Sequence, residues 1–229
     1  MSSYYLASAN KIKTFPSLIG DQVADICIIG AGYTGLSSAL HLAEKGYKVT
    51  VVEAETLGFG ASGRNGGHVG IGQRQDQQYL EKAFGPEIAA VLWHMSLEAV
   101  DTVKGLIQKH KIKCDLKHGN VHFAHRAKYS HDLEEEVAFL HDRYNFDQMD
   151  YVPKERLSEV IDSDAYHCAV VDRASKHLHP LNYLLGLAAA AVKAGVVIYE
   201  NSTVTSYAGT PVVVKTIGGQ ITANEVILA

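Results

Sequence analysis

Three glycines with GxGxxG spacing are the first residues whose type and position point to a chemistry. Gly30, Gly32 and Gly35 follow an apolar run at 26–29 and precede a helical pattern at 36–43. In such a unit the first glycine permits a tight turn, the second lets the backbone approach a pyrophosphate, and the third lets helix and strand pack closely. The helix N-terminus offers unpaired N–H groups to phosphate. The spacing predicts a dinucleotide-binding turn, with a ligand-free glycine turn as the alternative.

An acidic residue stands at the end of the next predicted strand. Glu53 follows the β-branched run 49–52 and lies 18 positions beyond Gly35. This is close to the spacing of a carboxylate that accepts hydrogen bonds from ribose hydroxyls. A carboxylate would repel a 2′-phosphate, which disfavours an NADP-type ligand. Strand, turn, helix and strand form one βαβ unit, and this motif alone leaves FAD and NAD open.

A second glycine-rich segment, GFGASGRNGGH, follows at 58–68. Six glycines fall among the thirteen residues 58–70, and glycine is concentrated where the backbone must come close to another group. The Ser62 hydroxyl and the neighbouring N–H groups are suited to an anion nest. Arg64 is suited to pairing with a phosphate or a carboxylate. A flexible surface loop is the alternative.

Together these motifs resemble the D-amino-acid-oxidase-like, FAD-dependent oxidoreductases. The resemblance rests on the dinucleotide turn, on Glu53 and above all on the GFGASGRNGGH loop. It extends to the leader at 3–11 and to the segment at 177–182, and so covers all 229 residues. Members of the family are roughly twice this long, which is the length of two full domains. The resemblance therefore implies that the family's second half is absent here, with a glycine-containing turn expected just beyond Ala229.

The resemblance implies a set of FAD-binding residues. Residues 57–68 would line the pyrophosphate and reach the flavin ring, and Val204 would present backbone atoms to the adenine. His68 departs from the family pattern, because related enzymes often carry Gln there. It is a candidate for contacting the flavin, contacting the substrate or bonding covalently to the flavin, and the alternative is a loop histidine without a special role. The residues expected to bind FAD are Gly30, Ala31, Gly32, Tyr33, Thr34, Gly35, Glu53, Ala54, Gly60, Ala61, Ser62, Arg64, Asn65, Gly66, Gly67, His68 and Val204.

The reaction implied by the resemblance is oxidation of an amine C–N bond, with γ-glutamylputrescine as the leading substrate. FAD would take a hydride equivalent from the carbon bearing a neutral amine, and the imine would hydrolyse to aldehyde and ammonia. Oxygen would be the electron acceptor and hydrogen peroxide the product. No residue is singled out as catalytic. Two alternatives stay open: a family member acting on a secondary amine or an amino acid, and a truncated, non-catalytic FAD-binding fragment or partner subunit.

The elements that position these motifs indicate an α/β fold. We expect a Rossmann-like FAD-binding domain, begun by the βαβ unit and interrupted by a mixed α+β substrate-domain insertion. The chain stops on an apolar strand, which is typical of a truncated product. The expected divisions are a leader at 1–22, the first part of the FAD domain at 23–74, a helical and substrate-domain insertion at 75–175, and a truncated return segment at 176–229.

Further elements follow from apolar periodicity and turn residues. Helices are expected at 76–111 and 128–144, and a third opens at Pro180. The inward face of the first is Leu92, Ala99, Val103, Leu106 and Ile107. Glu134, Glu135 and Glu136 are interpreted as a solvated face of the second. Strands are expected at 119–124, 196–199, 212–215 and 226–229, and mixed signals at 151–171.

Composition limits the partners. The net charge is −4, with 47% hydrophobic and 20% charged residues, which is typical of a globular protein. Apolar runs are too short to span a membrane, and the lack of a basic block disfavours nucleic-acid and membrane partners. The partners expected are a small-molecule amine, oxygen and, as an open case, a second chain or oligomer.

The histidine groups at 118–125 and 177–179 lack completing ligands, so no metal is expected. Cys27, Cys114 and Cys168 are widely spaced, which indicates reduced thiols and a cytoplasmic protein.

Overall fold

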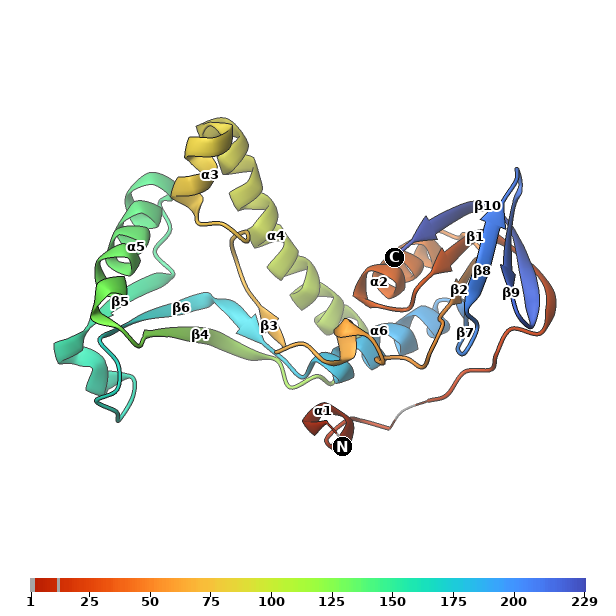
Figure 1. Ribbon diagram of the computed structural model, residues 1–229, viewed down its shortest axis with the longest axis horizontal. Coiled ribbons are helices and arrows are strands. Elements are labelled where there is room, and N and C mark those ends of the chain that lie inside the picture. Colours follow the sequence, from red (N-terminus) through yellow and green to blue (C-terminus); the bar gives the residue numbers. More distant parts are fainter. Residues whose placement is uncertain (1–2, 12) are drawn as a thin grey trace. The chain divides into compact units, whose positions relative to one another are not determined.

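The computed structural model describes residues 3–11 and 13–229, which form two compact units (Figure 1). The first unit contains the described residues of Met1–Gly67 together with Ile107–Asp115 and His179–Ala229. The second contains His68–Leu106 and Leu116–Leu178. Each unit therefore draws on segments that are far apart in the sequence.

A six-stranded sheet in the order β7-β2-β1-β10-β9-β8 forms the centre of the first unit. The strands β7, β2, β1 and β10 are mutually parallel, whereas β9 and β8 continue the sheet in antiparallel fashion. A βαβ start and a largely parallel sheet confirm the expected α/β class. The bounds are β1 Gly20–Ile29, β2 Val49–Val52, β7 Val197–Tyr199, β8 Val204–Ala208, β9 Val212–Thr216 and β10 Gly219–Leu228.

Two helices pack against each other in this unit, α2 (Tyr33–Glu44) and α6 (Pro180–Lys193). Pro180 occupies the first turn of α6, as expected, because its missing N–H has no partner to lose there. The apolar spacing of the two sequences places leucines on the shared face, and burial of these side chains stabilises the packing. The fully buried leucines are Leu36, Leu40, Leu181, Leu184 and Leu187.

The second unit is an antiparallel sheet with helices. Strands β3 (His68–Val69), β4 (Lys117–Ala124) and β5 (Met149–Pro153) all pair with the central β6 (Cys168–His177). Val152 and Ala169 pack with Leu157 in a small core on this sheet. The helical elements are α3 Gln77–Phe84, α4 Pro86–His110 and α5 Ser130–Tyr144, with short 3₁₀ turns at Ala127–Tyr129 and Lys154–Glu159.

Several strand predictions require correction. The segment expected as a leader contains regular structure, because Tyr4–Ala7 form a short helix, α1, and β1 already begins at Gly20. The last strand is longer than expected and begins at Gly219 instead of 226. Both extensions arise from parallel pairing between β1 and β10, which starts at the Gly20–Gly219 pair. Such a pairing supplies backbone partners to residues whose own sequence is not strand-like.

The helix predicted over 76–111 is divided in two. Gly85, with φ of 83°, ends α3, and Pro86 begins α4. Glycine adopts this left-handed region without strain, and proline suits the first turn of a helix. The inward face was also wrong at Ala99, which is exposed, whereas Trp93 and Val100 are buried.

The N-terminal segment is anchored on the beginning of α6. The imidazole Nδ1 of His179 accepts a hydrogen bond from the Asn182 backbone N–H at 3.1 Å, which caps the helix. Its Nε2 lies 3.1 Å from the Ser8 hydroxyl. The Asn182 side-chain oxygen accepts a bond from the Asn10 backbone N–H at 2.7 Å. Two segments that carry the family resemblance therefore meet here.

A buried carboxylate ties another part of the leader to the sheet. Glu200 follows β7 and is 2% exposed. Its two oxygens accept hydrogen bonds from the backbone N–H groups of Leu57, at 2.6 Å, and Phe15, at 2.8 Å. Sequence reasoning did not single out this residue. Its carboxylate joins three chain segments that are distant in sequence.

Replacing Glu200 by Gln should lower the free energy of unfolding by about 1–3 kcal/mol, because an amide NH₂ would face a backbone donor and leave it unbonded. The measurement is the midpoint of chemical denaturation. Glu225→Gln, at an exposed position of β10, is the matched control and should leave the midpoint unchanged. Equal midpoints for both variants would contradict this role.

Candidate functional site

The carboxyl ends of the parallel strands gather the chemistry-bearing residues of the first unit. Gly30 follows β1, Glu53 follows β2 and Glu200 follows β7. The strand β1 pairs with β2 on one side and with β10 on the other. In open α/β sheets, ligands bind beyond the carboxyl ends of the strands, at such a point of divergence.

The glycine turn is too tightly packed for side chains at two of its three positions. Gly30 has φ of 108°, and a Cβ there would lie 2.2 Å from the Ala229 carbonyl oxygen. A Cβ at Gly35 would lie 2.0 Å from the Gly30 carbonyl oxygen. At Gly32 it would reach only the Ser62 hydroxyl, at 3.1 Å. Gly30 and Gly35 therefore set the helix-to-strand distance, and Gly32 is the position with room.

The N-terminus of α2 offers hydrogen-bond donors. The helix has no capping side chain of its own at Gly32, and the Ser62 hydroxyl accepts a bond from the Tyr33 N–H at 3.1 Å. Within residues 3–11 and 13–229, the N–H groups of Gly32, Thr34 and Gly35 have no acceptor. Orphan donors at the positive end of a helix dipole fit the phosphate groups of a dinucleotide.

Glu53 both fixes this turn and keeps acceptor capacity. Its Oε2 accepts a bond from the Ala31 N–H at 2.8 Å, and its Oε1 accepts one from the Glu55 N–H at 3.1 Å. A carboxylate has about four lone-pair sites, so both oxygens can still accept further bonds. Glu53 therefore has the hydrogen-bond acceptor capacity that the two hydroxyl groups of a ribose require. The neighbouring Ala54 is exposed.

The glycine-rich loop is fixed from within by one amide. The Asn65 NH₂ donates to the carbonyls of Ala61 and Ser62, both at 3.2 Å, and its carbonyl oxygen accepts from the Gly67 N–H at 2.9 Å. A Cβ at Gly63 would lie 2.1 Å from the Gly58 carbonyl oxygen, so the loop closes on itself at a glycine. Gly63 is therefore required by the internal packing of the loop.

Tyr33 connects this loop to α6. Its hydroxyl donates to the Pro180 carbonyl at 3.0 Å and accepts from the Asn65 NH₂ at 3.3 Å. The ring lies 5.3 Å from that of Tyr183. Burial raises the pKa of Tyr33, and the Asn65 hydrogen bond opposes that rise. The phenol therefore remains a neutral donor and joins α2, the loop and α6.

The other predicted cofactor residues lie apart from this network. The Arg64 guanidinium lies over the exposed Phe59 ring at 4.7 Å, and no carboxylate among the described residues pairs with it. Val204 begins β8 and pairs with Thr216. Gly60 precedes the 3₁₀ turn Ala61–Gly63, and Gly66 is exposed.

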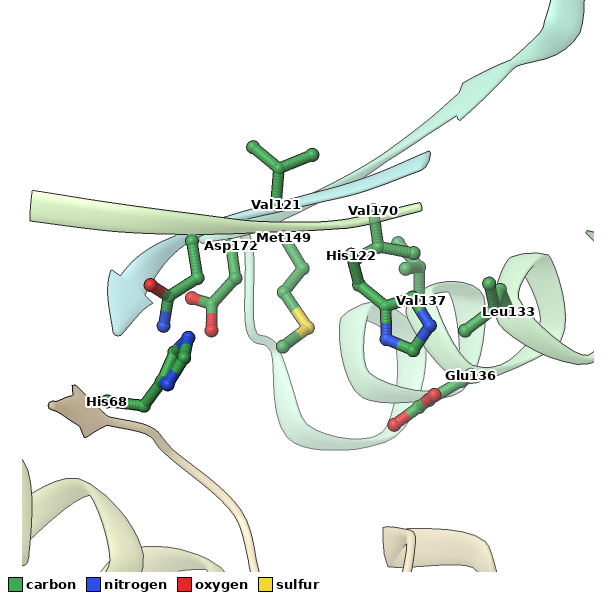
Figure 2. Close-up of a pocket in the computed structure, with 10 residues that line it drawn as sticks. His68, Val121, His122, Leu133, Glu136, Val137, Met149, Val170 and Asp172 are labelled. Carbon is green, nitrogen blue, oxygen red and sulfur yellow. The ribbon is translucent and has the colours of Figure 1, made fainter. Parts of the chain in front are cut away.

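His68 belongs to the second unit, where it pairs with His177 in the sheet. Its side chain lines a cavity of about 360 Å³ (Figure 2). The further residues that line it are Asn120, Val121, His122, Leu133, Glu136, Val137, Met149, Val170 and Asp172. Among the described residues, no three His, Cys, Asp or Glu side chains are placed to hold a metal ion.

The interpretation of 134–136 as a solvated face was wrong for Glu136. Its side chain is half-buried and lines this cavity, whereas Glu134 and Glu135 are exposed. The signal was present in the sequence, because Glu136 stands three positions after Leu133 and four before Leu140, on the apolar side of α5.

No helix in the described part of the chain combines the length and the apolar character needed to cross a membrane. The described cysteines Cys27, Cys114 and Cys168 are buried and form no disulfide bond. Burial raises the pKa of Cys27 to about 12, so this thiol remains protonated and unreactive.

Comparison with known proteins agrees with this geometry. The chain is 41% identical over 229 residues to gamma-glutamylputrescine oxidoreductase of Escherichia coli, covering 100% of this chain and 54% of that protein. It is 42% identical to a probable oxidoreductase, OrdL, of Haemophilus influenzae, covering 99% of this chain and 53% of that protein. The chain thus spans about half the length of these relatives.

Solved structures share the fold. Glycine oxidase from Geobacillus kaustophilus has a TM-score of 0.75 at 22% identity, covering 91% of this chain and 55% of that one. L-amino acid deaminase from Proteus myxofaciens has a TM-score of 0.74 at 24% identity, covering 97% of this chain and 48% of that one. Residues 25–229 match the family of FAD dependent oxidoreductases. The resemblance drawn from the glycine motifs is thereby confirmed, and the chain belongs to the FAD-dependent oxidoreductase family, whose cofactor is FAD.

Proposed function

We propose that the protein uses FAD to oxidise the C–N bond of an aliphatic amine, with γ-glutamylputrescine as its substrate. The observation that carries the proposal is the 41% identity to gamma-glutamylputrescine oxidoreductase along all 229 residues. Because the chain spans about half of that relative, the proposal concerns the whole protein to which this sequence belongs. The first unit would be its FAD-binding domain, and the second would contribute to its substrate domain.

In this proposal the carboxyl edge of the first sheet holds the cofactor. The free N–H groups at the start of α2 bind the pyrophosphate, and Glu53 accepts bonds from the ribose hydroxyls. The Asn65 network holds the glycine-rich loop in place, and Val204 lies toward the adenine. These assignments are supported by the orphan donors and by the acceptor capacity that remains on Glu53.

FAD, when bound, supplies the acceptor for a hydride equivalent. The overall reaction converts a primary amine, oxygen and water to an aldehyde, ammonia and hydrogen peroxide. The amine loses two electrons and two protons to oxygen, and water supplies the aldehyde oxygen. The contribution of this chain is binding and orientation, because its described residues at the carboxyl edge offer hydrogen-bond donors and the Glu53 carboxylate, whereas the Glu200 carboxylate is buried and bonded to the backbone.

Glu53→Gln should weaken FAD binding by about 1.5–3 kcal/mol, roughly 10- to 100-fold in Kd, because a charge-assisted hydrogen bond to the ribose is replaced by a neutral one. The glutamine oxygen can still accept the Ala31 N–H, so the turn should persist. The measurement is fluorescence titration of the apoprotein with FAD. Glu55→Gln, at an exposed site two residues away, is the control. Equal affinity in both variants would remove Glu53 from the cofactor site.

The substrate assignment predicts that the holoenzyme consumes oxygen and forms equimolar peroxide with γ-glutamylputrescine. Its kcat/KM should exceed the values for glycine, sarcosine and proline by roughly 100-fold, because a site built around polar groups of one ligand rejects analogues that lack them. An oxygen electrode and a coupled peroxide assay make the comparison. Preference for sarcosine or glycine would establish the secondary-amine or amino-acid alternative. Turnover with an artificial dye but without oxygen uptake would exclude oxygen as acceptor.

A further inference from the structure

The second unit contains a cavity whose polar groups are unevenly distributed. It lies between α5 and one face of the sheet, where His122 pairs with Val170 and Met149 pairs with Asp172. In the view of Figure 2, His68 and Asp172 lie toward one side, His122 and Glu136 toward the other, and Met149 between them. The cavity thus offers two polar regions separated by an apolar stretch.

Glu136 is a carboxylate in this cavity without a bonding partner among the described residues. Among the described residues, no hydrogen bond or ion pair reaches its carboxylate, although it is half-buried. Burial raises its pKa, the nearby Asp76 carboxylate raises it further, and His122 opposes both. A half-buried carboxylate that lacks a compensating bond costs stability. Such a group marks a candidate ligand contact.

In the other polar region, the Asp172 carboxylate already accepts hydrogen bonds from the protein backbone. Asp172 Oδ1 accepts hydrogen bonds from the backbone N–H groups of Ala174 and Ser175, both at 2.9 Å. These bonds stabilise the β6 backbone where its pairing with β4 is irregular, and they reduce the demand of Asp172 for a cation. Figure 2 shows the Met149 side chain between the two regions, with Leu133 and Val137 on the side of Glu136, and these apolar side chains suit methylene groups.

We propose that Glu136 binds a protonated amino group on the aliphatic chain of the substrate, and that this pocket selects amines that carry such a second, cationic group. The inference rests on the proposed function and deepens it. γ-Glutamylputrescine has this form, because it carries the amine to be oxidised at one end and an α-ammonium group at the glutamyl end. Glu136 is then a specificity-determining residue, whereas the oxidation itself depends on the flavin.

The kinetic test compares two substrates that differ at one group. N-glutarylputrescine matches γ-glutamylputrescine but lacks the α-ammonium. In the holoenzyme, Glu136→Gln should raise KM for γ-glutamylputrescine roughly 10-fold, at little change in kcat, because one ion pair is lost. KM for N-glutarylputrescine should stay the same. Glu135→Gln, at an exposed position that contacts His131, is the matched control and should alter neither value.

A stability measurement separates ligand binding from a structural role. The raised pKa means that the folded protein holds the Glu136 proton more tightly than the unfolded chain, so stability falls as pH rises through that range. Glu136→Gln should therefore raise Tm at neutral pH while weakening the substrate. Wild-type affinity for the cationic group should decline as pH falls, and this decline should begin at a higher pH than a carboxylate of ordinary pKa would require. The other titratable groups near Glu136 are Asp76 and His122, whose charges act on it, and His68 and Asp172, which line the same cavity.

Direct binding keeps the test decisive if γ-glutamylputrescine is not turned over. Calorimetry with γ-glutamylputrescine and N-glutarylputrescine, on protein with bound FAD verified by absorbance, should show a preference for γ-glutamylputrescine that Glu136→Gln removes. A wild-type protein without this preference, or a variant that loses both substrates equally, would overturn the assignment of Glu136. Failure to bind FAD or to oxidise any amine would instead overturn the proposed function.

Discussion

The structure at the carboxyl edge depends on one steric constraint, the contact between the start of α2 and the end of β1. A methyl group at Gly35 would lie 2.0 Å from the Gly30 carbonyl oxygen, so no other residue permits this approach. The contact brings the N–H groups of the first helical turn to the strand ends, where Glu53 binds the Ala31 N–H. Without it, the Ser62 hydroxyl would not reach the Tyr33 amide. The cofactor assignment depends on this contact more than on any single polar residue.

Two glutamates, Glu200 and Glu136, differ in how far the protein compensates the charge of a buried or partly buried carboxylate. Glu200 is almost fully buried, and its oxygens accept two backbone N–H groups, so its charge is compensated within the protein. Glu136 is less buried, yet no hydrogen bond or ion pair among the described residues reaches its carboxylate, and only the nearby His122 opposes the rise of its pKa. The first arrangement stabilises the fold, because the desolvation of the carboxylate is offset by hydrogen bonds. The second costs stability, and such a cost is typical of sites that must remain ready for a ligand.

Features that depend on residues close together in the sequence could be predicted, whereas features that depend on residues far apart in the sequence could not. The glycine turn, Glu53 and the start of α6 at Pro180 depend on neighbours within one βαβ unit or one helical turn, and they could be predicted from the sequence. The early start of β10 at Gly219 could not, because it depends on pairing with Gly20, about 200 residues away. The role of Glu200 could not be predicted for the same reason, because its hydrogen-bond donors at Phe15 and Leu57 are far away in the sequence. The partial burial of Glu136 was not predicted for a different reason, because two exposed glutamates directly precede it and the run of three was interpreted as one solvated face.

The two units also differ in how their chemistry is encoded. The cofactor features lie in two short motifs, whereas the cavity of the second unit is assembled from β3, β4, β5, β6 and α5. The fold itself is shared with a glycine oxidase at only 22% identity. Residues that line the cavity can change singly without disturbing the fold, as long as the sheet and helix remain. In the proposed assignment, substrate preference depends on positions such as Glu136, which lies outside the glycine motifs that carry the family resemblance.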